Sequence, residues 1–398
     1  MTPSMASIDT ALTAIPRGPV FSVTMLGKDR KVDLPRIDRQ GQCLYTTSGR
    51  AAILLALRAF GVSHGAEVLV PSYHCPTMIE PAVRVGARPM FYPIGCDGKA
   101  DMEFVRGVDT SRVKAMIAAH FFGLPIDLRD VRAFCDSRGV ALIEDCAHAF
   151  FGSLHRNPVG TSGDAVIGSL VKFLPVTEGG CLILRAPDVQ LPTLRRPRVG
   201  REIRVAWDIL EAGARAGKLG TSGALLAALA NLKDRLKGRS FEAPRISMSE
   251  AERGDACNTI DIDRAETAAA SLVRWVASHA DCGRIAEARR SNYLRFAALL
   301  SGHELIRPLF PDLPPGAVPY VFPLDVDAPE LLYPSLRACG VPAYRWDIVW
   351  PGTPSLPSDA AKRWSTHVLQ LACHQDMSEA DVSAIARVIK RKSSAPRH

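Results

Sequence analysis

Residues 140–148 read Val-Ala-Leu-Ile-Glu-Asp-Cys-Ala-His, an apolar run that ends in two adjacent carboxylates. A continuous apolar run of this length is typical of a strand that is covered on both faces, as in a parallel sheet. Ligands of such sheets gather at the carboxyl ends of the strands. We therefore predict a strand over Ala141–Asp145 that places Glu144 and Asp145 on opposite faces beside a binding site.

Short apolar runs of the same kind alternate with helical patterns through the first half of the chain. This alternation indicates an α/β fold built on a mainly parallel sheet. The other predicted strands are Glu67–Val70, Arg88–Tyr92, Lys114–Ala119, Ala165–Ser169 and Gly180–Leu184. The predicted helices among them are Arg50–Phe60, Thr77–Val85 and Leu128–Arg138.

The C-terminal part has the mixed pattern of a smaller α+β lobe. We predict a long amphipathic helix from Ala265, with helix continuing over Ile285–Leu300. Further along, the predicted strands are Tyr320–Val326 and His367–Leu371, and the predicted helices are Glu330–Ala338 and Glu379–Lys392. The chain therefore divides into a large domain over residues 1–270 and a small domain over residues 271–398.

A basic helical insertion interrupts the large domain at about residues 186–256. Between Arg185 and Arg245 there are 13 Lys and Arg against 6 Asp and Glu, nearly the whole of the net charge of +8. Its clearest helix, Ala224–Leu236, repeats leucine at helical spacing, at Leu225, Leu229, Leu232 and Leu236. We expect a surface helix with one buried face and one solvated basic face. The alternatives are a lid over an anionic substrate and a surface for a partner or for membrane headgroups.

Composition excludes several classes of protein. Hydrophobic residues make up 47% and charged residues 23% of the 398 residues, as in ordinary globular proteins. No apolar run is long enough for a membrane span, and no secretory signal is recognisable. The ten cysteines form no CxxC pair, which favours reduced thiols in a cytoplasm over disulfides or a metal site. The basic segment has only Trp207 and Phe241 as aromatic residues, so we do not expect nucleic-acid binding.

A helix N-terminus that can bind an anion is predicted at residues 47–51, Thr-Ser-Gly-Arg-Ala. Ser48 is a good N-terminal cap, and Gly49 lets the backbone approach a ligand closely. The free N–H groups of such a start can bind a phosphate, although most caps serve only the helix. No GxGxxG or GxxxxGK[ST] motif accompanies it, so dinucleotide and P-loop binding lose their main support.

Two further residues have a chemical interpretation. A carboxylate at the end of a buried strand, such as Asp145, is costly unless it meets a positive charge, and a protonated pyridine nitrogen is one such charge. Lys172 follows the apolar strand Ala165–Ser169, so partial burial would keep its amine neutral and available for imine formation. The alternatives are a helix cap or structural ion pair for Asp145 and a surface turn for Lys172.

Together, the helix start, the Glu-Asp-x-Ala-His strand end and the lysine followed by Glu-Gly-Gly resemble the DegT/DnrJ/EryC1/StrS aminotransferases. The resemblance runs from about Tyr45 to Leu184 and returns weakly at Val341–Tyr344 and Val368–Asp376. It implies a fold-type-I enzyme with pyridoxal 5'-phosphate (PLP) as cofactor. It also implies a homodimer with shared active sites, a keto-sugar or related small keto substrate, and an amino donor such as glutamate.

The resemblance also assigns roles to residues of this chain. Lys172, six residues before Glu178 as in the family, would form the Schiff base with the cofactor and act as the catalytic base. Asp145 would pair with the pyridine nitrogen, and His148 would lie near the ring oxygen. The phosphate would be held by residues of the helix start and of the following strand end: Ser48, Gly49, Arg50 and Ser169.

Some positions depart from the family pattern. Cys75 stands where the family places an aromatic residue that stacks on the cofactor ring, and the neighbouring Tyr73 or His74 would have to stack instead. Ser169 lies two residues closer to the lysine than the family spacing. Asn258 is a possible substitute for the asparagine that a second subunit brings to the phosphate. These departures leave two alternatives to transamination: another PLP chemistry (elimination, condensation or cyclisation) in natural-product biosynthesis, and a non-catalytic relative.

Overall fold

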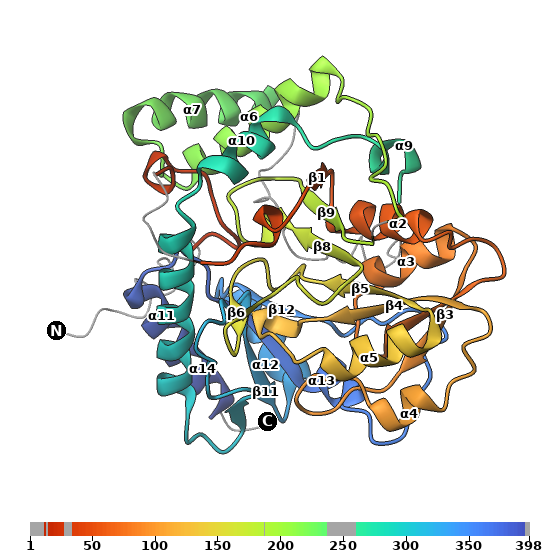
Figure 1. Cartoon of the computed structure of the whole chain (residues 1–398). Helices are drawn as coiled ribbons and strands as arrows, with labels where there is room; N and C mark the ends of the chain where they lie inside the picture. Colours follow the sequence, from red (N-terminus) through yellow and green to blue (C-terminus); the bar gives the residue numbers. More distant parts are fainter. Residues whose placement is uncertain (1–11, 13–14, 28–33, 187, 237–259, 395–398) are drawn as a thin grey trace.

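A seven-stranded sheet forms the centre of the computed structural model, which describes residues 12, 15–27, 34–186, 188–236 and 260–394 (Figure 1). The strands follow the order β1 (Cys43–Thr46), β9 (Gly180–Leu184), β8 (Ala165–Ser169), β5 (Ala141–Asp145), β4 (Val113–Ala119), β2 (Glu67–Pro71) and β3 (Arg88–Tyr92). The five strands from β8 to β3 are parallel, whereas β9 runs antiparallel to both β8 and β1. The predicted α/β fold with a mainly parallel sheet is therefore confirmed.

The helices that connect the parallel strands are α2 (Gly49–Ala59), α3 (Pro76–Arg84), α4 (Met102–Arg106) and α5 (Arg129–Arg138). The start of α2 is capped as the sequence predicts, because the Ser48 side chain accepts a hydrogen bond from the Ala51 N–H at 3.1 Å. Each predicted strand and helix of this half lies within one residue of its observed bounds. Strand β1 was missed, because a half-buried four-residue strand has too short a pattern to recognise.

A second sheet, antiparallel and of four strands, lies in the C-terminal lobe. Its order is β10 (Ile306–Pro308), β11 (Val321–Val326), β13 (Val368–Ala372) and β12 (Ala343–Arg345). The helices of this lobe are α11 (Cys282–Leu300), α12 (Pro329–Ala338), α13 (Ala361–His367) and α14 (Glu379–Ser393). One continuous hydrophobic cluster joins residues of both sheets, so the two lobes share a core.

The long helix that we predicted from Ala265 is wrong. Helix α9 (Ile262–Ala265) ends at that residue, and two separate helices follow, α10 (Ser271–His279) and α11. The chain between α9 and α10 instead runs along the edge strand β1, where Ala268 forms a bridge with Thr46 and the Ala269 N–H donates to the Tyr45 carbonyl at 3.0 Å. Sheet-edge hydrogen bonds thus replace the helical ones in this connection.

The basic insertion forms a pair of helices, α6 (Val199–Arg215) and α7 (Gly220–Leu236), seen at the top of Figure 1. Helix α6 was not predicted. The buried leucine face predicted for α7 is also wrong, since Leu225, Leu229 and Leu232 are 68%, 49% and 53% exposed. The buried positions in the described part of α7 are instead the small residues Gly223 and Ala230, and Gly223 lies beside Ala214 of α6. The side chain of Leu236 lies outside the described part, and none of the described helices is long and apolar enough to cross a membrane.

Candidate active site

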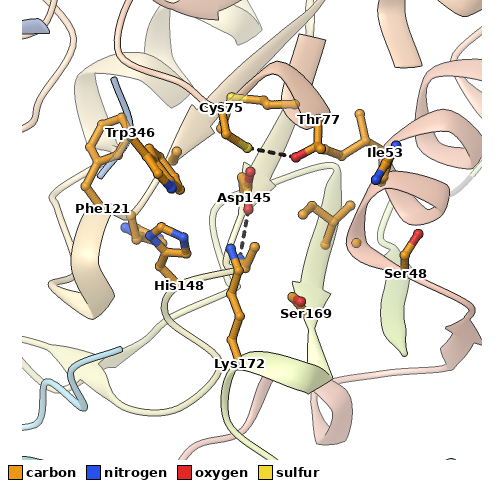
Figure 2. Close-up of a pocket in the computed structure, with 17 residues that line it drawn as sticks. Ser48, Ile53, Cys75, Thr77, Phe121, Asp145, His148, Ser169, Lys172 and Trp346 are labelled. Carbon is orange, nitrogen blue, oxygen red and sulfur yellow. Dashed lines mark hydrogen bonds between the residues drawn. The ribbon is translucent and has the colours of Figure 1, made fainter. Parts of the chain in front are cut away.

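A pocket opens at the carboxyl ends of the parallel strands (Figure 2). It encloses about 170 Å³, slightly more than the roughly 150 Å³ cavity that admits benzene, so a single aromatic ring fits. Its lining residues include Ser48, Gly49, Arg50, Cys75, Thr77, His120, Phe121, Asp145, Ala147, His148, Ser169, Lys172 and Trp346. The sheet topology therefore brings together eight of the site residues that the sequence indicated.

Lys172 enters the pocket from a single 3-10 turn, η4 (Leu170–Lys172), which directly follows β8. Burial lowers the pKa of the lysine, while the nearby Cys75 and Asp145 partly oppose this shift. A lowered pKa increases the fraction of neutral amine near neutral pH. The Nζ atom lies 5.2 Å from the centre of the Tyr320 ring. The side chain is therefore suited to act as a nucleophile or a base in the pocket.

Asp145 ends β5 on the pocket side, and its carboxylate is almost fully buried. Burial raises the pKa of Asp145, whereas a hydrogen bond from the Ala147 N–H at 2.8 Å and the charge of Lys172 lower it. No ion pair among the described residues reaches this carboxylate. It is thus placed to interact with a positive charge on a ligand.

His148 presents an unpaired hydrogen-bond donor in the pocket. Its Nδ1 accepts a hydrogen bond from the Phe122 N–H at 3.3 Å, which places the proton of the neutral ring on Nε2. Burial and the nearby Lys172 lower the pKa of His148 well below its usual value, so the ring is neutral. Nε2 is buried and has no partner among the described residues. An acceptor atom on a ligand would satisfy it.

The opposite end of the pocket is built from close-packed backbone. Gly49 begins α2, and a Cβ atom at this residue would lie 3.5 Å from the Gly168 carbonyl oxygen and 3.6 Å from Ser169. A Cβ at Gly180 would come within 2.3 Å of the Ser48 backbone, so only glycine fits at the start of β9. The first N–H groups of α2 point out of the helix at this place and can bind an anion. Arg50 lies beside them and forms an ion pair with Glu80 at 2.9 Å.

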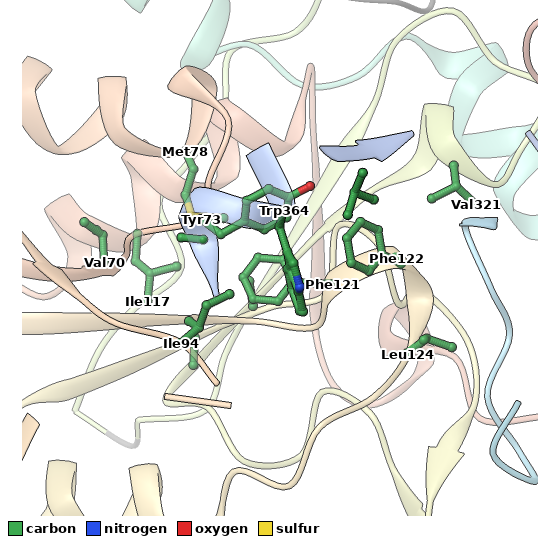
Figure 3. Packing of buried hydrophobic residues seen from close by; sticks show 14 of the residues in the cluster. Val70, Tyr73, Met78, Ile94, Ile117, Phe121, Phe122, Leu124, Val321 and Trp364 are labelled. Carbon is green, nitrogen blue, oxygen red and sulfur yellow. The ribbon is translucent and has the colours of Figure 1, made fainter. Parts of the chain in front are cut away.

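Cys75 lines the pocket, but the two residues before it do not. Tyr73 is fully buried in an aromatic cluster that includes Phe121, Phe122 and Trp364 (Figure 3). His74 stacks on Phe91, and its Nε2 accepts a hydrogen bond from the Trp350 N–H at 2.9 Å. Both side chains thus help to join the lobes instead of facing the pocket. Asn258 lies outside the described residues.

The C-terminal lobe contributes aromatic residues that sequence analysis missed. Trp346, which follows β12, lines the pocket with its ring centre 4.7 Å from that of His148. Tyr320, which precedes β11, contacts the same histidine at 4.6 Å. These residues lie far from Lys172 in the sequence, and no local motif marks them. Only the packing of the lobes shows that they belong to the site.

Glu144, the second carboxylate of the strand end, stabilises the backbone next to the site by hydrogen bonds. It accepts hydrogen bonds from the N–H groups of Gly160, Ser162 and Gly163 at 2.6, 2.8 and 2.9 Å, and from His120 Nε2 at 3.0 Å. His120 and Cys146 complete a group with the spacing of metal ligands. The carboxylate nevertheless already accepts these four hydrogen bonds, so we interpret the group as a structural hydrogen-bond network next to the pocket.

Glu144→Gln is expected to lower the free energy of unfolding at neutral pH by about 2–4 kcal/mol, because an amide cannot accept at both positions. Burial raises the pKa of Glu144, but its hydrogen bonds outweigh burial and the pKa is lowered. The stabilisation is therefore present at neutral pH and is lost as the pH falls through the folded-state pKa.

Urea unfolding from about pH 7 to pH 3 measures both effects. The difference in free energy of unfolding between wild type and variant should become smaller as the pH falls. Glu103→Gln, an exposed change in α4, is the control and should change the stability by less than about 0.5 kcal/mol. An equal effect of the two substitutions would show that Glu144 does not support the fold.

Comparisons with known proteins agree with the resemblance seen in the sequence. Residues 36–202 match the model of the DegT/DnrJ/EryC1/StrS aminotransferase family. A GDP-perosamine synthase from Vibrio cholerae is 32% identical over 145 residues, which cover 36% of this chain and 40% of that relative. A UDP-N-acetyl-3-dehydro-alpha-D-glucosamine 3-aminotransferase from Acidithiobacillus ferrooxidans is 36% identical over 120 residues, 29% of this chain and 32% of that relative. The chain thus matches two fifths or less of the length of these two relatives.

Solved structures show the same fold over most of the chain. The aminotransferase TlmJ from Streptoalloteichus hindustanus has a TM-score of 0.60 at 21% identity, over 88% of this chain and 85% of that one. An aminotransferase from Brucella abortus has a TM-score of 0.58 at 19% identity, over 89% of this chain and 86% of that one. The structural likeness therefore extends well beyond the segment that is similar in sequence.

Proposed function

We propose that this chain, whose residues 36–202 match the model of the DegT/DnrJ/EryC1/StrS aminotransferase family, is a PLP-dependent aminotransferase. The observation that carries the proposal is the position of Lys172 and Asp145 in one pocket, with the start of α2 at its other end. The names of the relatives support a keto-sugar or related small keto compound as substrate. An amino donor such as glutamate completes the reaction.

The residues of the pocket fit PLP in charge and in hydrogen-bonding character. Lys172 supplies a buried amine for the aldehyde, and Asp145 supplies a carboxylate for a protonated pyridine nitrogen. The unpaired Nε2–H of His148 suits the ring oxygen. The N-terminus of α2, with Ser48, Gly49, Arg50 and Ser169 around it, suits the phosphate.

The cofactor, when bound, supplies an electron sink for the negative charge that develops on the substrate carbon. Asp145 would keep the pyridine nitrogen protonated, because a buried carboxylate favours the charged form of a neighbouring cation. Lys172 would hold the cofactor, and its Nζ, when free, would move the proton from and to the substrate carbon. Trp346, His148 and Tyr320 form an aromatic wall beside this amine.

Three further properties belong to the same proposal. The enzyme would act in the cytoplasm and as a homodimer with shared active sites, as in the family that the sequence resembles. In such a dimer, Asn258 of a second subunit would reach the phosphate. The boundary between large and small domains would lie at residues 270 and 271, where α10 begins.

A second candidate is a PLP enzyme with another reaction type, such as elimination, condensation or cyclisation. The observation that favours it is Cys75 at the pocket wall, where its Sγ lies 2.8 Å from Thr77 Oγ1. A small thiol at this place leaves room that an aromatic ring would fill. A different substrate could therefore be oriented above the cofactor.

The test is an absorption spectrum of the purified protein after reconstitution with PLP. We expect a visible band from the lysine-bound cofactor, and we expect glutamate alone to remove it, because a transaminase completes its first half-reaction without an acceptor. A band that no amino donor changes would favour the second candidate. If no band forms, the proposed function is wrong.

A further inference from the structure

Arg289 of α11 is a fully buried arginine without a carboxylate partner among the described residues. Its exposed fraction is 0%. Burial lowers the pKa of Arg289 to about 10, so the guanidinium is still charged at neutral pH. A buried charge costs free energy unless neighbouring dipoles stabilise it. The groups that stabilise Arg289 therefore show what the residue holds in place.

Those groups are main-chain carbonyls next to the pocket. Nη2 of Arg289 donates to the carbonyl oxygen of Lys172 at 2.7 Å. Nη1 donates to the Tyr320 carbonyl at 3.0 Å and to the Pro319 carbonyl at 3.2 Å. The guanidinium thus joins the turn that carries the lysine to the segment that carries Tyr320, one of the aromatic residues around Lys172.

Gln375 completes this contact from the segment after β13. Its Oε1 accepts from Arg289 Nε at 2.9 Å, and its Nε2 donates to the Phe173 carbonyl at 2.8 Å. The Phe173 ring also lies against the guanidinium, 4.6 Å from its central carbon. Two consecutive carbonyls of the turn are therefore fixed by the C-terminal lobe.

We propose that Arg289 is a positioning residue for Lys172, which fixes the main chain of the η4 turn together with Gln375 and so sets where the lysine amine lies in the pocket. This inference rests on the proposed function only for the chemical role of Lys172. The placement of the amine can be measured without any cofactor.

Loss of Arg289 is expected to raise the pKa of Lys172 for two reasons. A loosened turn lets water reach the amine, and a positive charge close to the turn disappears, and both changes favour the protonated amine. The other titratable groups that face Lys172 are Asp145 of β5, Cys75 before α3, His148 after β5 and Tyr320 before β11. All of them stay unchanged in the experiment.

The experiment measures the pH dependence of acetylation of Lys172 by acetic anhydride in the cofactor-free full chain, read by peptide mass spectrometry. We expect Arg289→Met to raise the midpoint of acetylation by about one pH unit. At any pH below the midpoint, the fraction of neutral amine is then roughly tenfold smaller than in the wild type. Arg289→Lys keeps the charge but not the planar set of donors, and should give an intermediate shift. It also provides a result if the methionine variant does not fold.

Arg290→Met and Arg290→Lys are matched controls, because the neighbouring Arg290 donates to the carbonyls of Pro314 and Ala317 but not to the η4 turn. These controls should leave the Lys172 midpoint unchanged. Equal midpoints in the Arg289 and Arg290 variants would overturn the positioning role. A wild type that takes up no PLP, with the midpoint shift still present, would contradict the proposed function alone.

Discussion

Lys172→Ala is expected to abolish covalent cofactor attachment and to reduce turnover by at least about 10³-fold. The reason is that this lysine provides the only amine among the residues that line the described pocket. The same side chain would both hold the cofactor and move the proton. Its removal therefore affects two steps of the reaction.

The measurement combines steady-state turnover with peptide mass spectrometry of the protein after reduction by borohydride in the presence of PLP. The wild type should gain the mass of one cofactor at Lys172, and the alanine variant should gain none there. Lys114→Ala, which changes an exposed lysine of β4, serves as the control and should behave as the wild type. Full turnover of the Lys172 variant would show that Lys172 is not the residue that binds the cofactor and moves the proton.

Asp145→Asn is expected to reduce turnover by about 10²–10³-fold while leaving the fold intact. An amide of the same shape cannot keep a pyridine nitrogen protonated, so the cofactor becomes a weaker electron sink. Burial raises the pKa of Asp145, which means that its ionised form costs stability above the pKa of the unfolded state. The neutral asparagine should therefore be as stable as the wild type at neutral pH, or more stable.

Turnover and urea unfolding, measured side by side, distinguish the two carboxylates of the strand end. The Asp145 variant should lose activity and keep stability, whereas the Glu144 variant should lose stability. An Asp145→Asn protein with full activity would show that this carboxylate does not act on the cofactor. A large loss of stability in that variant would instead assign Asp145 to the scaffold.

The sequence was most informative where structure depends on local pattern. Four of the strands have the predicted bounds, and three of them, β5, β8 and β9, are buried over nearly their whole length, as their apolar runs predict. The topology of a parallel sheet then brings the strand ends together, which places Asp145 and Lys172 in one pocket. Their roles toward a cofactor, and the domain boundary at residues 270 and 271, stay predictions.

Where long-range packing decides the position of a side chain, the sequence carries no local signal for it. Tyr73 has no local feature that directs it into the shared core instead of the pocket, and Trp346 and Arg289 have none that directs them to the site. The exposed leucines of α7 show the same limit. Helical spacing predicts that one face is apolar, but it does not show whether that face packs against the protein.

The contacts of Arg289 and Gln375 also determine when the site can form during synthesis. Arg289 follows Lys172 by 117 residues, and Gln375 follows Phe173 by 202 residues. At a translation rate of about 5–20 residues per second, Gln375 is added roughly 10–40 s after the turn that it holds. The first sheet can therefore form on the ribosome before its lysine turn is held in place, and capture of a cofactor in the final geometry must wait until Gln375 has been made.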